Sequence, residues 1–171
     1  MSGEPKRVDV KVVYKPGKTP NVELVSKITT KEGLLKFKND KHDGFWVHFN
    51  LDDDTLADYR FVQSGMSPMY SVLGDQCPTQ GLWDGFKPHD VFERTLIVRN
   101  KNVLLQGKSE ERFSFALRVT KDPAGNGPVV ELDPGGVNQN GPTKPLSKAA
   151  LLITGGVVGA VLALGAEALL S

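Results

Sequence analysis

Cysteine is almost absent from this sequence, and no long apolar run occurs before residue 149. Cys77 is the only cysteine among 171 residues, so no disulfide can form within the chain, and a reducing compartment is favoured. No apolar core follows the basic residues of the N-terminus, as a secretory signal peptide would require. No Asn-x-Ser/Thr sequon is present either. These absences predict a cytosolic location for the part of the chain before residue 149.

The sequence also lacks a net charge of either sign. Its 21 Lys and Arg residues face 20 Asp and Glu residues, and no basic stripe stands out, so we expect no nucleic-acid partner. Glycine and proline are abundant, at 18 and 11 residues, which is too many for a helical bundle. They follow no period, which excludes collagen and simple repeats. The length is that of one domain with appendages.

Alternation of apolar and polar residues predicts about seven short strands. The strands are expected at residues 8–14, 21–30, 34–38, 45–51, 92–100, 113–120 and 129–132. In the strand at 113–120, one face carries Phe113, Phe115, Leu117 and Val119, and the other carries Ser114, Ala116 and Arg118. We expect the first set in the core.

No helical period appears before residue 146, and turn residues separate the predicted strands. The pattern predicts an all-β fold, specifically an antiparallel immunoglobulin-like sandwich over residues 1–132. The disulfide of antibody domains is absent, because the chain has a single cysteine.

The end of the predicted domain resembles a known family. Residues 129–138 read Val-Val-Glu-Leu-Asp-Pro-Gly-Gly-Val-Asn and follow a Phe-x-Phe-x-Leu-x-Val strand. They resemble the ends of small bacterial single-sandwich proteins, sometimes called DP-EP proteins, which finish a last strand with Asp-Pro-x-x-x-Asn. The resemblance covers residues 92–140. It implies a bacterial β-sandwich and carries no function.

Residues 133–147 are rich in Gly, Pro and Asn and predict an extended linker. Residues 149–164 then contain no charge at all, so 148–171 is predicted to be one C-terminal transmembrane helix. As a helix, residues 149–170 would measure ~33 Å, enough for a hydrocarbon core of roughly 30 Å. The alternative is an amphipathic helix docked on the domain, although no polar stripe supports it. Lys144 and Lys148 precede the apolar run, which predicts a single-pass protein with a cytoplasmic N-terminal domain.

Small residues recur within the predicted span. They form a small-xxx-small pattern that lets helices approach closely. The positions are Gly155, Gly156, Gly159, Ala160 and Ala163. We expect helix–helix contact on this face, with the alternative that Gly and Ala are simply common in membrane helices.

No residue pattern predicts catalysis, a metal or a cofactor. His42, His48, His89 and Cys77 match no zinc spacing. The acidic residues 52–54 lack the glycine and glutamate of a calcium loop and are expected to form a solvated turn. No G-x-S-x-G sequence occurs. The chain is therefore predicted not to be an enzyme.

Residues 63–90 form an irregular stretch with many contact-prone side chains. Loops held by a rigid sandwich often bind partners, and Trp, Tyr and Met are favoured at such surfaces. The candidate partner-binding residues are Met66, Met69, Tyr70, Trp83 and Phe86. The alternative, equally supported, is that these side chains cap an open end of the sandwich.

Taken as a whole, the pattern favours a membrane-anchored interaction or structural protein. We expect an accessory subunit of a larger membrane complex, with the membrane and other protein subunits as partners. A second possibility is a membrane effector that oligomerises through its Gly-rich helix, with the β-domain as its sensor. A third is a tethered sandwich that binds a small ligand.

Overall fold

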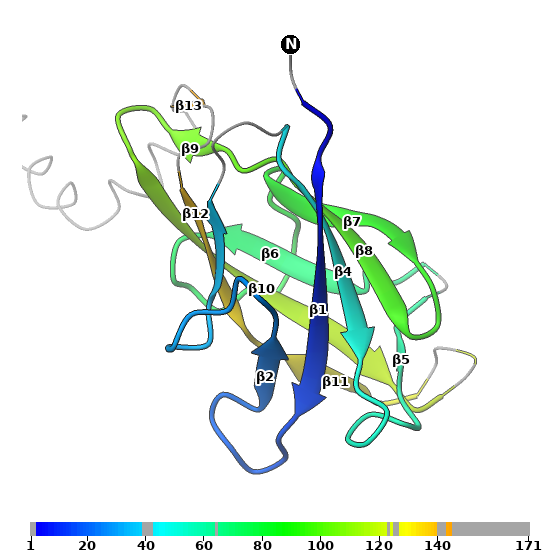
Figure 1. The fold of residues 1–171 in the computed structure, drawn as a ribbon. Helices are drawn as coiled ribbons and strands as arrows, with labels where there is room; N and C mark the ends of the chain where they lie inside the picture. Colours follow the sequence, from blue (N-terminus) through cyan, green and yellow to red (C-terminus); the bar gives the residue numbers. More distant parts are fainter. Residues whose placement is uncertain are drawn as a thin grey trace, which may run out of the picture.

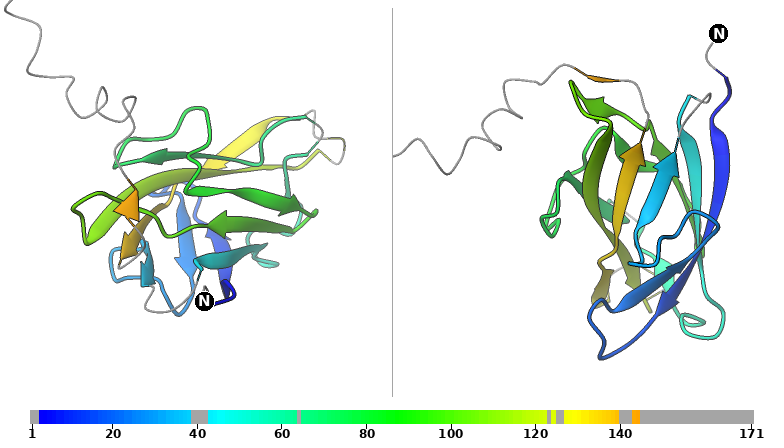
Figure 2. Two further views of the ribbon diagram at one scale, coloured as in Figure 1. Left: turned by 90° about the horizontal axis from the view of Figure 1, so that it is seen from above. Right: turned by 60° about the vertical axis from the view of Figure 1, so that its left-hand side comes forward.

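The fold consists of two β-sheets packed face to face, with a short two-stranded sheet at one end (Figure 1). The computed structural model describes residues 3–38, 43–63, 65–122, 124, 127–139 and 143–144. Seen from above, the sheets form two layers (Figure 2, left). The expected all-β sandwich is confirmed.

The first sheet has five strands in the order β2-β1-β4-β8-β7. Their bounds are β1 Lys6–Tyr14, β2 Val22–Val25, β4 Phe45–Leu51, β7 Phe86–Val91 and β8 Thr95–Asn100. Each long strand turns alternate apolar residues inward, as in β4, where Phe45, Val47 and Phe49 are buried. This alternation fixes which face of the sheet joins the core.

The second sheet has six strands and is built around β10. Its strands are β3 Leu35–Lys38, β5 Arg60–Phe61, β6 Met69–Leu73, β10 Glu110–Thr120, β11 Val129–Leu132 and β12 Gly135–Gln139. One edge of β10 pairs with β11 and β12, and the other edge pairs with β5 and β6. The third sheet joins β9 Leu104–Leu105 to β13 Thr143–Lys144.

Phenylalanine rings fill the space between the two sheets. The ring of Phe86 lies 4.7 Å from that of Phe113 and 4.9 Å from that of Phe115, between centroids. Phe49 reaches Phe115 at 5.5 Å, and Phe37 reaches Phe45 at 5.2 Å. Such aromatic contacts add to the hydrophobic effect of burying each ring. The core therefore links both sheets through one continuous cluster.

A buried polar bridge joins the sheets at the end that carries β9. The Asn100 amide of β8 donates to Asn138 Oδ1 of β12 at 2.9 Å. The backbone N–H of Asn102 donates to Asn100 Oδ1 at 2.7 Å, and Asn102 holds a positive φ of 47°. Asparagine tolerates this conformation better than most residues. The turn at residues 100–102 thus also links the two sheets.

The expected buried face of β10 is confirmed. Phe113, Phe115, Leu117 and Val119 are each at most 1% exposed. Ser114 and Arg118 lie on the other face, where the Arg118 side chain packs over Tyr70 at 4.6 Å. Ala116, which was also expected opposite this face, is buried at 1% exposure.

The expectation of a purely antiparallel sandwich is wrong, because both large sheets are mixed. β1 runs parallel to β4, and β12 runs parallel to β3. Parallel neighbours need long connections, so they come from distant segments of the chain. Local alternation of residues cannot reveal such a pairing.

The expected linker at residues 133–147 is corrected in its first part. Gly135–Gln139 is a strand that pairs with β10 and β3, and Thr143–Lys144 pairs with β9. The domain therefore extends beyond residue 132. A Gly-rich strand shows no apolar alternation, but its backbone bonds and the buried Val137 and Asn138 hold it in the sheet.

The core predicts a large effect for one ring. We expect Phe115→Ala to lower the free energy of unfolding of the full chain by about 3–5 kcal/mol, because it opens a cavity where several rings meet. Phe92, which is 55% exposed at a hairpin tip, provides the matched control. Phe92→Ala should change stability by no more than ~0.5 kcal/mol. Denaturant unfolding measures both, and equal effects would contradict the assigned core.

Candidate functional site

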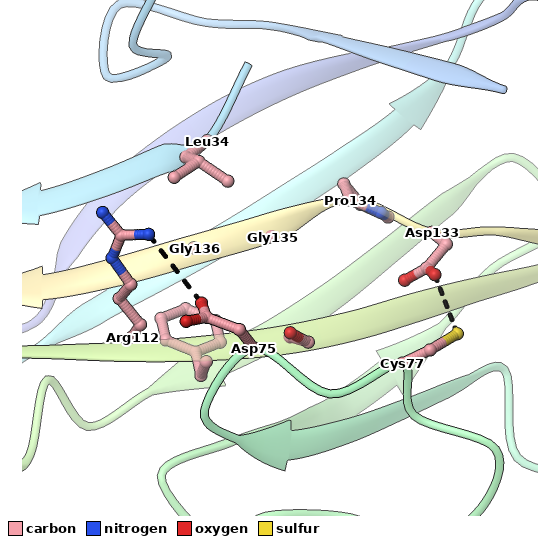
Figure 3. A pocket seen from close by; sticks show the side chains of 10 residues that line it. Leu34, Asp75, Cys77, Arg112, Asp133, Pro134, Gly135 and Gly136 are labelled. Atoms are coloured by element: carbon pink, nitrogen blue, oxygen red, sulfur yellow. Dashed lines mark hydrogen bonds and ion pairs between the residues drawn. The ribbon is translucent and has the colours of Figure 1, made fainter. Parts of the chain in front are cut away.

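A pocket of about 270 Å³ lies on the outer side of the six-stranded sheet, where β10 meets β12. It is lined by Leu34, Asp75, Cys77, Arg112, Phe113, Ser114, Asp133, Pro134, Gly135 and Gly136. Figure 3 shows an ion pair at one end, a thiol–carboxylate pair at the other, and the glycines between them. None of the charged members was predicted as a site residue.

Two glycines shape this pocket. Gly136 pairs with Phe113, and a Cβ on Gly136 would lie 2.4 Å from the phenyl Cζ, so the ring occupies the space of the missing side chain. Gly135 pairs with Ser114 on the outer face, where an added Cβ would come within 2.8 Å of Leu34 Cδ2. Gly136 therefore leaves room for the Phe113 ring in the core, and Gly135 leaves the floor of the pocket without a side chain on the outer face.

Cys77 and Asp133 form the thiol–carboxylate pair. The thiol donates to Asp133 Oδ2 at 2.8 Å, joining the loop after β6 to the start of β12. This hydrogen bond, together with partial desolvation and the nearby carboxylate charge, raises the pKa of the Cys77 thiol. A thiol held protonated is a poor nucleophile and a poor metal ligand. The geometry therefore favours a structural hydrogen bond between two segments of the chain over a reactive cysteine.

The ion pair at the other end is loose. Arg112 Nη1 lies 3.9 Å from Asp75 Oδ1, and the two side chains are 56% and 76% exposed. Exposed pairs of this kind contribute little to stability. The guanidinium is thus available to an incoming acidic group. The pocket offers polar binding groups on a flat floor, and it offers no activated nucleophile.

The predicted partner-binding residues separate into two groups. Met69 and Phe86 are fully buried, in β6 and β7, so these two are core residues. Trp83 is half-buried and packs on Phe113 at 5.5 Å. Met66, at 39% exposure, and the half-buried Tyr70 remain accessible. Met69 and Phe86 therefore belong to the core, and partner binding stays a prediction for Met66 and Tyr70.

The acidic turn after β4 is held by protein groups. Asp52 is buried and lies 2.5 Å from Lys11 Nζ, and its other oxygen accepts from the N–H and hydroxyl of Thr55. Arg94 fastens the same loop from the β7–β8 hairpin. Its guanidinium donates at 2.9–3.1 Å to the carbonyls of Leu51, Leu56, Ala57 and Tyr59.

Histidine placement gives no metal site either. His48 lies on the outer face of β4, where burial lowers its pKa. The His89 ring contacts the Trp46 ring in a tilted arrangement, with 4.6 Å between centroids. His42 lies outside the described residues. Among the residues that the structure describes, no group of three or more His, Cys, Asp or Glu is placed to hold a metal ion.

The predicted helix–helix face lies outside the described residues, from Gly155 to Ala163. Within the described part of the chain, no helix is long and apolar enough to cross a membrane. No protein-family model matches the chain, and no curated protein matches it.

The Cys77–Asp133 pair leads to a prediction about thiol reactivity. Asp133→Asn keeps an acceptor but removes the negative charge, so the pKa of Cys77 should fall toward its ordinary value. The pH profile of iodoacetamide alkylation should shift to lower pH, because the thiolate is the reactive form. Asp75→Asn, at the other end of the pocket, is the control and should leave the profile unchanged. An unshifted profile in the Asp133 variant would contradict the hydrogen bond between Cys77 and Asp133.

Proposed function

We propose that this chain is a membrane-anchored interaction protein, an accessory subunit whose sandwich presents binding surfaces on the cytosolic side. The observation that carries the proposal is the run of sixteen uncharged residues at 149–164, which follows a folded β-domain. Such a run is long enough, together with residues 165–170, to cross a hydrocarbon core. The basic residues before it favour a cytosolic domain.

The pairing of β13 with β9 supports a short tether. Thr143 pairs with Leu104 and Lys144 with Leu105, so the chain is fixed to one end of the sandwich at residue 144. Only residues 145–148 separate this point from the apolar run. Four extended residues span at most about 14 Å. In this proposal the β9 end of the domain therefore stays next to the bilayer surface.

The sandwich itself supports binding over catalysis. The accessible apolar side chains near β6 are those of Met66 and Leu82, at 39% and 46% exposure. The polar pocket with Arg112 lies on the same sheet. A rigid sheet with such side chains suits recognition of another subunit.

The immunoglobulin-like classification and the likeness to bacterial DP-EP proteins stay predictions.

The anchor is tested with the full chain. Replacing both Val158 and Leu162 with Lys should release the protein from membranes into the soluble fraction, because each charge near a bilayer centre costs roughly 2.5–3.5 kcal/mol. Val158→Leu is the matched control and should stay in the membrane pellet after a high-salt wash. Membrane retention of the double Lys variant would contradict the proposed anchor.

The same fractions test the subunit role. Gly159→Leu should insert normally but lose co-purifying membrane proteins, because a bulky side chain separates helices that approach at glycine. Val158→Leu, about 100° away on a helix, should keep them. If the protein is instead a self-associating effector, Gly159→Leu should abolish its own oligomer and the ion leakage that the parent chain causes. Equal partner recovery in both variants would remove the glycine face from the proposal.

A further inference from the structure

Half of strand β1 has an unused hydrogen-bonding edge. The Lys6 N–H donates to the Gly44 carbonyl at 3.0 Å, and the Val12 carbonyl accepts from the Asp52 N–H at 2.9 Å. The backbone N–H and C=O groups of the even-numbered residues of β1 therefore point toward β4. In a strand next to a parallel neighbour, alternate residues direct their N–H and C=O groups to the opposite side. The backbone groups of Arg7 and Asp9 therefore point away from β4.

Strand β2 covers only the other half of that edge. It pairs with Lys11–Tyr14 and ends at Val25, opposite Lys11. In the described part of the chain, no strand pairs with the remaining edge of β1 at Arg7 and Asp9. The right-hand view of Figure 2 shows the N-terminal half of β1 along one side of the fold. An open edge of this kind is a template for another strand.

The sequence of this open edge is complementary to itself. In an antiparallel pair centred on Val8, Arg7 of one copy lies opposite Asp9 of the other, and the reverse holds by symmetry. Both side chains are exposed on the outer face of the sheet, at 65% and 56%. Opposite charges directly across an antiparallel pair stabilise it. Within one chain the two charges already form an ion pair at 2.7 Å, so each is poised to exchange partners.

We propose that two copies of this chain associate through residues 6–10 of β1, antiparallel and in register at Val8, to form one continuous sheet. The Arg7 and Asp9 backbones exchange hydrogen bonds with those of the second copy. The stretch of β1 that can pair is limited at both ends. Val25 already pairs with Lys11 at one end, and Pro5 has no backbone N–H to donate at the other.

A five-residue contact is small, so the dimer is weak and the dimeric fraction rises with protein concentration. Confinement of both copies to one membrane would raise their effective concentration and hence the dimer population. The open edge is defined by β1, β2 and β4, and none of these strands belongs to the apolar run. The proposed dimer therefore stands or fails independently of the tail.

Charge exchange provides the first test, on the full chain in detergent. Arg7→Asp alone and Asp9→Arg alone place like charges opposite each other at both cross-strand pairs, so each should weaken self-association about tenfold or more. Mixing the two variants restores both attractive pairs, and a heterodimer should form as readily as the parent dimer. Sedimentation or light scattering measures the association. If the mixture associates no better than either variant alone, the proposed register is wrong.

Crosslinking provides the second test, in a Cys77→Ser background. Val8→Cys places two thiols at the two-fold axis, where directly opposed residues come within disulfide reach. Mild oxidation should then give a covalent dimer several times faster than in the control Phe92→Cys, which is exposed on a distant hairpin. Equal crosslinking rates in the two variants, or a fully monomeric parent chain at high concentration, would overturn the proposal.

Discussion

Contact between the rings of Phe86, Phe113 and Phe115 is the interaction on which the rest of this structure depends. Phe86 belongs to the five-stranded sheet, whereas the other two rings belong to β10 at the centre of the six-stranded sheet. Because the cluster bridges the layers, the two sheets share one core. Buried aromatic area of this size contributes a large part of the stability of a small domain. The glycines of β12 are a direct consequence, since Gly136 leaves space for the Phe113 ring.

Two surface features follow from how the strands pair. Because β10 uses both of its edges for pairing, β12 is held beside it and the pocket forms over Gly135. In the other sheet, the short β2 covers only part of β1, so no strand of the described residues pairs with the edge at Arg7 and Asp9. Both features are consequences of strand length and glycine placement.

Local patterns predicted the strands with clear apolar alternation, missed β7 and β12, and predicted the strand pairing poorly. Residues 45–51 and 129–132 match β4 and β11, because bulky apolar residues and flanking turns mark them clearly. The parallel pairs were missed, since they join segments far apart in the sequence. The strand at Gly135–Gln139 was read as linker because glycine carries no hydrophobic signal. The pocket charges gave no motif, because Arg112 and Asp75 come together only through the fold.

Hydrogen exchange under native conditions tests the central claim, that the aromatic cluster makes the two sheets one cooperative unit. Amides of β4 and of β10 should exchange only through global unfolding, with the same free energy of opening in both strands. Denaturant should then lower both values in parallel as it lowers the free energy of unfolding. If the amides of one sheet open at a clearly lower free energy than those of the other, the sheets unfold separately and the account is contradicted.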